Sequence, residues 1–162
     1  MDTNFKLSVR IIERDSGKAV FYKHDGQRFE QTHTVKMNAD KEYDIMFTLN
    51  PAMGIEKLLL NGEANKIDRC HDNNDEYEDT RTYVTHYETV SVDVCRRGKR
   101  RELLFVLDLD NGVYLKLSVQ CKVYKLGETT HCSWGQQLAG IELDCKIEEG
   151  QNYVQILHEK YF

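Results

Sequence analysis

The 162-residue chain has very little proline and no long apolar run. Pro51 is the only proline, and no stretch approaches the ~20 consecutive apolar residues that a membrane-spanning helix needs. The chain opens without the apolar segment of a secretory signal peptide, and Asp2 stands where N-myristoylation requires glycine. These absences predict that any membrane association depends on a partner or on a bound lipid.

The chain also lacks an excess of basic residues and a disulfide framework. Its formal net charge is -5, so no overall positive field exists to attract a nucleic acid. The five cysteines are odd in number and include no C-x-x-C pair, which is typical of proteins in a reducing compartment. We therefore expect a cytoplasmic, monomeric protein that does not bind nucleic acid and that associates with membranes only through its partner.

Motifs of several enzyme classes are missing as well. The chain contains no G-x-S-x-G, no P-loop, no H-E-x-x-H and no G-x-G-x-x-G. His131 and Cys132 are neighbours, but adjacent residues of a strand face opposite sides, and buried structural cysteine is the commoner state. A zinc site of His131, Cys132 and Cys145 would have irregular spacing and no clear fourth ligand. We expect no enzymatic activity, no cofactor and no metal centre, and we expect His33 to be a hydrogen-bonded core residue.

What the sequence does have is a two-residue alternation of apolar and polar side chains. In the segment 113–123 every odd position is apolar, so a strand here would present one apolar wall. The segment 103–109 repeats the pattern and is joined to the first by the turn sequence D-N-G. A three-residue turn with Gly112 in the left-handed conformation places Leu107 opposite Leu115, whereas a two-residue turn sets Leu115 against a polar residue. The pattern favours the three-residue turn, because both apolar sets then share one face.

Further segments show similar strand signals, and turn residues separate them at short intervals. No stretch of ten or more residues keeps a 3.6-residue period, so no helix is required. Without long helical crossovers the strands are expected to pair antiparallel. The sequence predicts one all-β domain over residues 1–162, an antiparallel β-sandwich or partly closed β-barrel of about nine or ten strands. The further segments are 5–11, 19–22, 29–37, 43–49, 55–60, 63–67, 83–87, 90–94, 141–147 and 153–157.

Two charged runs interrupt the strand pattern. Residues 72–79 contain five acids, and residues 96–101 contain five bases. The acidic run lacks the central glycine and the terminal glutamate of an EF-hand calcium loop, so we expect a solvated loop. We expect the basic run to be a polar hairpin connection, with attraction for an acidic membrane surface or partner as the alternative.

Two blocks of the sequence resemble a known family. The first is Ala19-Val-Phe-Tyr-Lys-His-Asp-Gly-Gln-Arg-Phe29, followed by Gln31 and Thr34-Val-Lys36, and the second is His131-Cys-Ser-Trp-Gly135, followed by Ile141-Glu142 and Cys145-Lys146. In order and spacing they are similar to the cannabinoid receptor-interacting protein 1 family, and the chain is identified as a divergent member. The resemblance implies an all-β cytosolic protein without enzymatic activity, similar in architecture to the Rho GDP-dissociation inhibitors. It also implies binding to the cytoplasmic tail of the type-1 cannabinoid receptor, with damping of its signalling.

The expected apolar wall adds a second function to consider. A sandwich that does not close tightly leaves a slot for an acyl or prenyl chain, and each buried methylene contributes ~0.8 kcal/mol; the alternative is a filled core without a ligand. The function we expect is a module that regulates a membrane receptor, and the alternative is a carrier for a lipidated protein such as a small GTPase. The single tryptophan is either a core plug or a lid over a pocket. The residues expected to contact the partner or the lipid are Phe21, Tyr22, Phe29, Phe47, Phe105, Leu117, Val119, Cys132 and Trp134.

Overall fold

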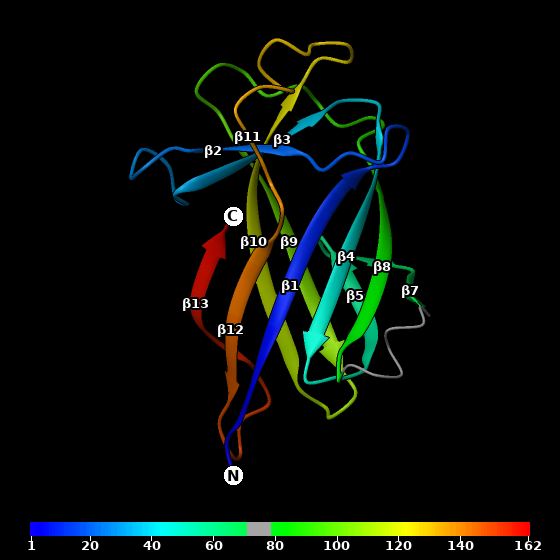
Figure 1. The fold of residues 1–162 in the computed structure, drawn as a ribbon, viewed down its shortest axis with the longest axis vertical. Helices are drawn as coiled ribbons and strands as arrows, with labels where there is room; N and C mark the ends of the chain where they lie inside the picture. Colours follow the sequence, from blue (N-terminus) through cyan, green and yellow to red (C-terminus); the bar gives the residue numbers. More distant parts are fainter. Residues whose placement is uncertain (71–78) are drawn as a thin grey trace.

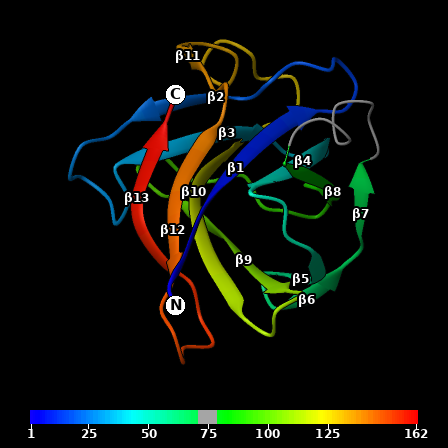
Figure 2. The ribbon, with the colours of Figure 1, turned by 60° about the horizontal axis from the view of Figure 1, so that its bottom comes forward.

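A computed structural model of the chain describes residues 1–70 and 79–162, and it consists of two β-sheets packed face to face (Figure 1). In Figures 1 and 2 the strands β1 and β12 of one sheet lie over β9 and β10 of the other. Among the described residues no helix is long and apolar enough to cross a membrane. The predicted all-β class is confirmed, and the form it takes is a sandwich, because each sheet ends in two edge strands and does not close into a barrel. Most of the acidic run, residues 72–78, lies outside the described residues.

The strands divide between a six-stranded and a seven-stranded sheet. The six-stranded sheet has the order β13 (Gln155–Tyr161), β12 (Ile141–Ile147), β1 (Thr3–Glu13), β4 (Glu42–Asn50), β8 (Arg81–Glu88) and β7 (Ile67–Cys70). The seven-stranded sheet has the order β11 (Gln136–Gln137), β2 (Phe21–His24), β3 (His33–Asn38), β10 (Tyr114–Tyr124), β9 (Arg101–Leu109), β5 (Ile55–Leu60) and β6 (Glu63–Asn65). Figure 1 shows β2, β3 and β11 gathered at the upper end of the long strands.

The hairpin of β9 and β10 forms as the alternation predicts. Leu107 lies opposite Leu115, and Phe105 lies opposite Leu117. Gly112 has a φ of 78°, in the left-handed region that the three-residue turn requires, and the Leu109 amide donates to the Val113 carbonyl at 2.8 Å. The register prediction is therefore confirmed, and the apolar sets of both strands face the opposite sheet.

Side chains from both sheets fill the space between them. The inward residues of β1, β4, β9, β10 and β12 belong to one hydrophobic cluster. At its centre the rings of Phe47 and Phe105 meet edge to face, with centroids 5.6 Å apart. Burying a side chain of this size contributes about 1.5–3 kcal/mol to stability, so the alternating residues drive the two sheets together.

The predicted strand pattern is wrong in several details. The described residues form thirteen strands, and β3 pairs with β10 in parallel, although all pairs were expected to be antiparallel. The segment 90–94 is not a strand, because the Thr89 side chain bonds to the carbonyls of Asn38 and Lys41 and ends β8. The segment predicted at 63–67 is divided, since β6 joins one sheet and β7 the other.

The segment 25–32 lies over the outer face of the seven-stranded sheet, and its residues 29–32, which were expected to begin the strand 29–37, are not part of β3. A buried ion pair fixes it: the side chains of Asp25 and Arg100 are 2% and 6% exposed, with Nη2 of Arg100 3.5 Å from Oδ1 of Asp25. Nε of Arg100 donates to Oγ1 of Thr34 at 3.1 Å, and the Thr34 hydroxyl donates to Asp25. The guanidinium also stacks on the Phe29 ring, 4.2 Å from its centroid. Arg100, which belongs to the basic run, is therefore a structural residue.

Replacing Arg100 should destabilise the fold strongly. In Arg100→Met the buried Asp25 carboxylate loses its buried cation and keeps only the more exposed Lys23, 3.6 Å away, and breaking a buried pair costs about 3–5 kcal/mol. Urea denaturation followed by circular dichroism measures the loss. The matched control is Lys99→Met, which removes a neighbouring exposed cation and should change stability by less than about 0.5 kcal/mol. Equal urea midpoints for the two variants would contradict this role of Arg100.

Candidate functional site

The outer face of the seven-stranded sheet holds a cavity of about 490 Å³ lined mainly by basic and aromatic side chains. We call it the basic pocket. β10 supplies the lysine and the tyrosine that stand two positions apart on its outward side, and β2 and β3 supply one lysine each. The other residues come from the loop before β9 and from the loop between β10 and β11. Its lining residues are Lys23, Lys36, Arg97, Lys122, Tyr124, His131 and Trp134.

Lys36 holds the loop that carries the single tryptophan. Its ammonium donates to the carbonyls of His131 at 2.9 Å and Trp134 at 2.8 Å. Lys36 is only 6% exposed, so these bonds replace the water that its charge would otherwise bind. The ammonium also lies 5.9 Å from the centroid of the Trp134 ring. Gly135, with a φ of 102°, lets the chain turn back beside this ammonium.

Cys132 points away from the basic pocket and stabilises the same loop. Its thiol donates to Oδ1 of Asn38 at 3.2 Å, and the Asn38 amide donates to the carbonyls of Lys125 and Glu128. Burial raises the pKa of the Cys132 thiol to about 12, and the nearby Glu128 adds to this rise. The thiol is therefore neutral at physiological pH and is unsuited to nucleophilic attack. Cys145 is buried in β12 of the opposite sheet.

Positive charge accumulates in the basic pocket. Lys36 and Lys122 are side by side in the parallel register of β3 and β10. Desolvation lowers the pKa of Lys36 below its ordinary value of 10.5, and Lys23 lowers it further. Desolvation also lowers the pKa of Lys122, followed by the charges of Arg100 and Lys23. Lys23 already pairs with Asp25 at 3.6 Å, and the crowding of the other cations means that a carboxylate or phosphate entering the pocket would be stabilised by their combined positive field.

The residues predicted to contact a partner or lipid occupy three different environments. Four of them are core residues with at most 1% exposure: Phe47, Phe105, Leu117 and Val119. Tyr22 and Cys132 are buried as well, whereas Phe21 and Phe29 are partly exposed. Trp134 is 71% exposed, so it is not a core plug, and it is the predicted residue that lines the basic pocket. The binding role of this set stays a prediction.

A second cavity lies next to the basic pocket and shares Lys36 with it. It has a volume of about 430 Å³ and brings together Phe21 and Cys132 from the predicted set. Tyr43 lines it too, and burial raises the pKa of that phenol far above its ordinary value, so the hydroxyl is neutral. The cavity is mixed in polarity, because Glu13 and Lys18 line it in addition to the shared Lys36.

Sequence reasoning missed the four cations of the basic pocket. Lys23 and Lys36 lie inside the first family-like block, and Arg97 lies in the basic run, but nothing in the alternation indicated that they meet Lys122. His33 also differs from its prediction as a core residue. It is partly exposed, its ring stacks on Tyr161 at 4.4 Å, and burial followed by the neighbouring His24 lowers its pKa.

The family described as CB1 cannabinoid receptor-interacting protein 1 matches residues 1–161. Proteins with that name from Bos taurus and Homo sapiens are each 25% identical over 157 residues, covering 96% of this chain and 94% of the relative. The protein with that name from Rattus norvegicus is 24% identical over 158 residues, with the same coverage. The resemblance of the two sequence blocks is thereby confirmed, and the chain belongs to the CB1 cannabinoid receptor-interacting protein 1 family.

Proposed function

We propose that this chain is a non-enzymatic cytoplasmic protein that binds an acidic segment in the cytoplasmic tail of a membrane receptor and modulates its signalling. Membership of a family named for receptor interaction supports a receptor as the partner. The observation that carries the proposal is the basic pocket, where Lys23, Lys36, Arg97 and Lys122 surround one cavity beside an exposed tryptophan.

The chemistry of the basic pocket fits an acidic peptide segment. Its volume of about 490 Å³ lies within the usual range of ligand sites, roughly 300–1,000 Å³. The lysines are crowded and partly desolvated, so a bound carboxylate relieves their repulsion and gains charge-assisted hydrogen bonds. The exposed ring of Trp134 offers a flat apolar contact to the neighbouring residue of the peptide, as tryptophan often does in interfaces.

Reversing one charge in the basic pocket should weaken binding of an acidic receptor-tail peptide. Lys122→Glu should raise Kd at least about tenfold, because it replaces an attraction of about 1.4 kcal/mol or more by repulsion. Titration calorimetry with a cytoplasmic-tail peptide, and with the same peptide carrying Gln and Asn for Glu and Asp, measures the effect. The control is Lys116→Glu, an exposed substitution on the same strand outside the pocket, which should bind nearly as wild type does.

The result can contradict the proposal in two ways. If Lys116→Glu weakens binding as much as Lys122→Glu, the attraction comes from overall charge and not from the basic pocket. If the neutral peptide binds as tightly as the acidic one, the pocket does not recognise negative charge. Trp134→Ala separates the aromatic contact from the charges: it should lower affinity without changing the urea midpoint, because the side chain is 71% exposed.

The affinity for an acidic peptide should begin to fall at a lower pH than it would if the lysines of the basic pocket had the ordinary lysine pKa. The free protein has lowered pKa values at Lys36 and Lys122, and a bound anion raises them again. Binding is therefore strongest at pH values below the lowered pKa values, where both lysines are charged. It declines as the pH rises through them, which happens before the pH reaches the ordinary lysine pKa of 10.5. Calorimetry between pH 7 and about 10 tests this. Lys122→Arg stays charged throughout and should flatten the profile; a wild-type affinity that is constant up to the ordinary lysine pKa would refute the mechanism.

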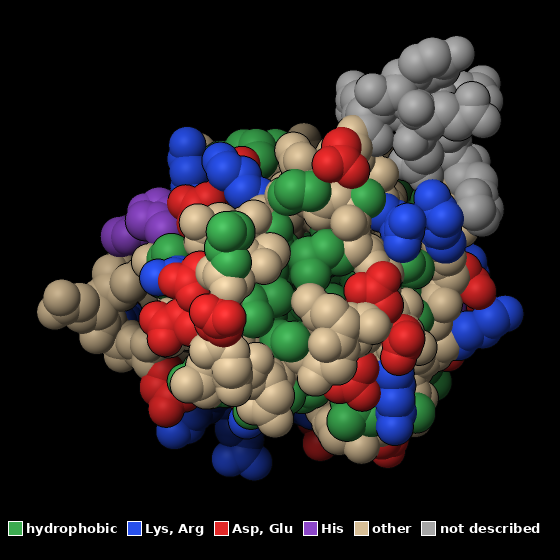
Figure 3. Space-filling view, turned by 90° about the horizontal axis from the view of Figure 1, so that it is seen from below, with side chains coloured by type: hydrophobic (Ala, Val, Ile, Leu, Met, Phe, Trp, Pro, Cys, Tyr) green, Lys and Arg blue, Asp and Glu red, His purple; other side chains and the backbone are tan. Residues whose placement is uncertain are grey.

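A carrier for lipidated proteins is the second function that we propose for test. Viewed from below, hydrophobic side chains gather in a hollow at the centre of this end of the sandwich (Figure 3). Near this end, a cavity of about 570 Å³ opens on the outer face of the six-stranded sheet, where Phe5, Cys145 and the exposed Leu157 line it together with the polar Asn4, Lys6, Asn50 and Asp144. The side chains further inside, such as Phe47 and Phe105, are in contact, so a lipid would have to separate them to enter more deeply.

If this cavity holds a lipid, a further charge in its lining should prevent binding. Leu157→Asp should weaken the binding of a fluorescent farnesylated peptide at least about tenfold, because the charge would lie against the chain. The control is Leu126→Asp, which changes a similarly exposed leucine in the loop after β10. Fluorescence anisotropy gives both affinities. Equal binding by the two variants, or no binding by wild type, would remove the lipid-carrier function.

A further inference from the structure

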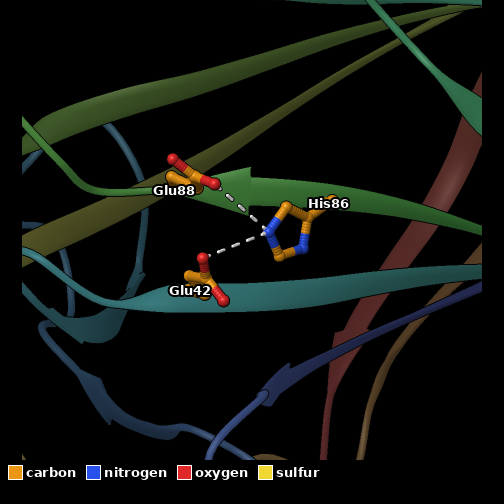
Figure 4. Close-up of side chains that lie close together, drawn as sticks. All are labelled: Glu42, His86 and Glu88. Atoms are coloured by element: carbon orange, nitrogen blue, oxygen red, sulfur yellow. Dashed lines mark ion pairs between the residues drawn. The ribbon is translucent and has the colours of Figure 1, made fainter.

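A cluster of one histidine and several carboxylates lies on the outer face of the six-stranded sheet, away from the basic pocket (Figure 4). Glu42 begins β4, and His86 and Glu88 stand at the end of β8. Their nearest ligand atoms, one from each residue, all lie within 4.8 Å of one another. We propose that Glu42, His86 and Glu88 bind a divalent zinc-type cation.

The strand register builds this arrangement from the backbone. β4 and β8 are antiparallel, with Glu42 directly opposite Glu88 and Asp44 directly opposite His86. Residues two apart on a strand share a face, and directly opposite residues have Cβ atoms roughly 4.5–5.5 Å apart. The three ligand side chains therefore project from a fixed part of the sheet, and their spacing does not depend on a loop.

Asp44 orients the imidazole for metal binding. Its Oδ1 lies 3.2 Å from Nδ1 of His86, so Nδ1–H can donate to the carboxylate. Nε2 then carries the lone pair and faces the glutamates, 4.0 Å from Oε1 of Glu42 and 3.5 Å from Oε1 of Glu88. Figure 4 shows this nitrogen between the two carboxylates. A carboxylate on the second ring nitrogen is the usual support of a histidine that binds a metal.

The balance of charge in the cluster also favours a cation. Glutamates directly opposite each other repel, and Asp44 adds a third carboxylate. Among the described residues Arg14 supplies a cation there: Nη1 lies 3.4 Å from Nε2 of His86 and 3.8 Å from Oε2 of Glu42, and Nε lies 3.6 Å from Oδ1 of Asp44. Three carboxylates and one guanidinium leave the group with a net charge of about −2. The Arg14 side chain is 52% exposed, so a metal ion can displace it into solvent.

The ligand set selects the kind of metal. One imidazole nitrogen and two carboxylate oxygens suit Zn²⁺, which binds such atoms at about 2.0–2.2 Å and completes its shell with water. Mg²⁺ and Ca²⁺ prefer oxygen ligands alone. Ligand atoms on a tetrahedral Zn²⁺ with such bonds lie roughly 3.4 Å apart. The three atoms, now up to 4.8 Å apart, have to approach one another by roughly 1.4 Å at most, and both glutamates are exposed enough to move.

The site can be tested with Zn²⁺ itself. Titration calorimetry of the full, metal-free chain should show one Zn²⁺ bound per chain, with Mg²⁺ and Ca²⁺ binding at least about a hundredfold more weakly. His86→Gln and Glu88→Gln should each raise the Kd for Zn²⁺ at least about tenfold. The matched control is His158→Gln, which removes an exposed histidine of β13 and should leave the Kd unchanged. Arg14→Met should lower the Kd, because it removes the competing cation.

Thermal unfolding provides a second readout that also reports on folding. Excess Zn²⁺ should raise the Tm of wild type and of His158→Gln but not that of His86→Gln, because only a ligand bound to the native state stabilises it. Zn²⁺ binding that survives in His86→Gln, or that is lost equally in His158→Gln, would place the metal elsewhere and overturn the proposal. A wild-type chain that binds no Zn²⁺ at millimolar concentration, or an Arg14→Met variant with unchanged affinity, would count against it in the same way.

Discussion

The parallel pairing of β3 with β10 is the constraint on which the basic pocket depends. This register sets Lys36 beside Lys122 on the outward side of the seven-stranded sheet. Two neighbouring lysines repel each other, and the arrangement persists because the Lys36 ammonium is bound by two backbone carbonyls of the loop after β10. The same bonds hold Trp134 at the rim. One pairing of strands thus decides where the charges lie and where the exposed ring stands.

A second interaction keeps the surroundings of the pocket in place. The Arg100–Asp25 pair is buried, and Thr34 and the Phe29 ring complete its contacts. Burying two charges costs free energy, but removing one partner of a buried pair costs more, because the other charge then stays buried without its partner. The pair therefore holds the segment 25–32 on the sheet. Residues of the basic run therefore have different roles: Arg100 stabilises the fold, and Arg97 lines the basic pocket.

The outer faces of the two sheets differ in charge. The seven-stranded sheet carries the basic pocket, whereas the six-stranded sheet carries Glu42, Asp44 and Glu88 around His86. The core between the sheets is apolar and closely filled, as the contact of Phe47 with Phe105 shows. In both proposals the charged ligand is bound by outward residues, which do not take part in the packing of the core.

The sequence by itself determined the β class, the inward apolar residues and the register of the β9–β10 hairpin, and two sequence blocks were enough to indicate the family. These features follow from neighbours along the chain: alternation decides the face of each side chain, and Gly112 decides the turn. Only the tertiary structure decided that Trp134 is exposed, that Lys36 is buried and that β3 runs parallel to β10. Lys36 and Trp134 are 98 positions apart, and such a contact depends on how the sheets assemble, which no local pattern encodes.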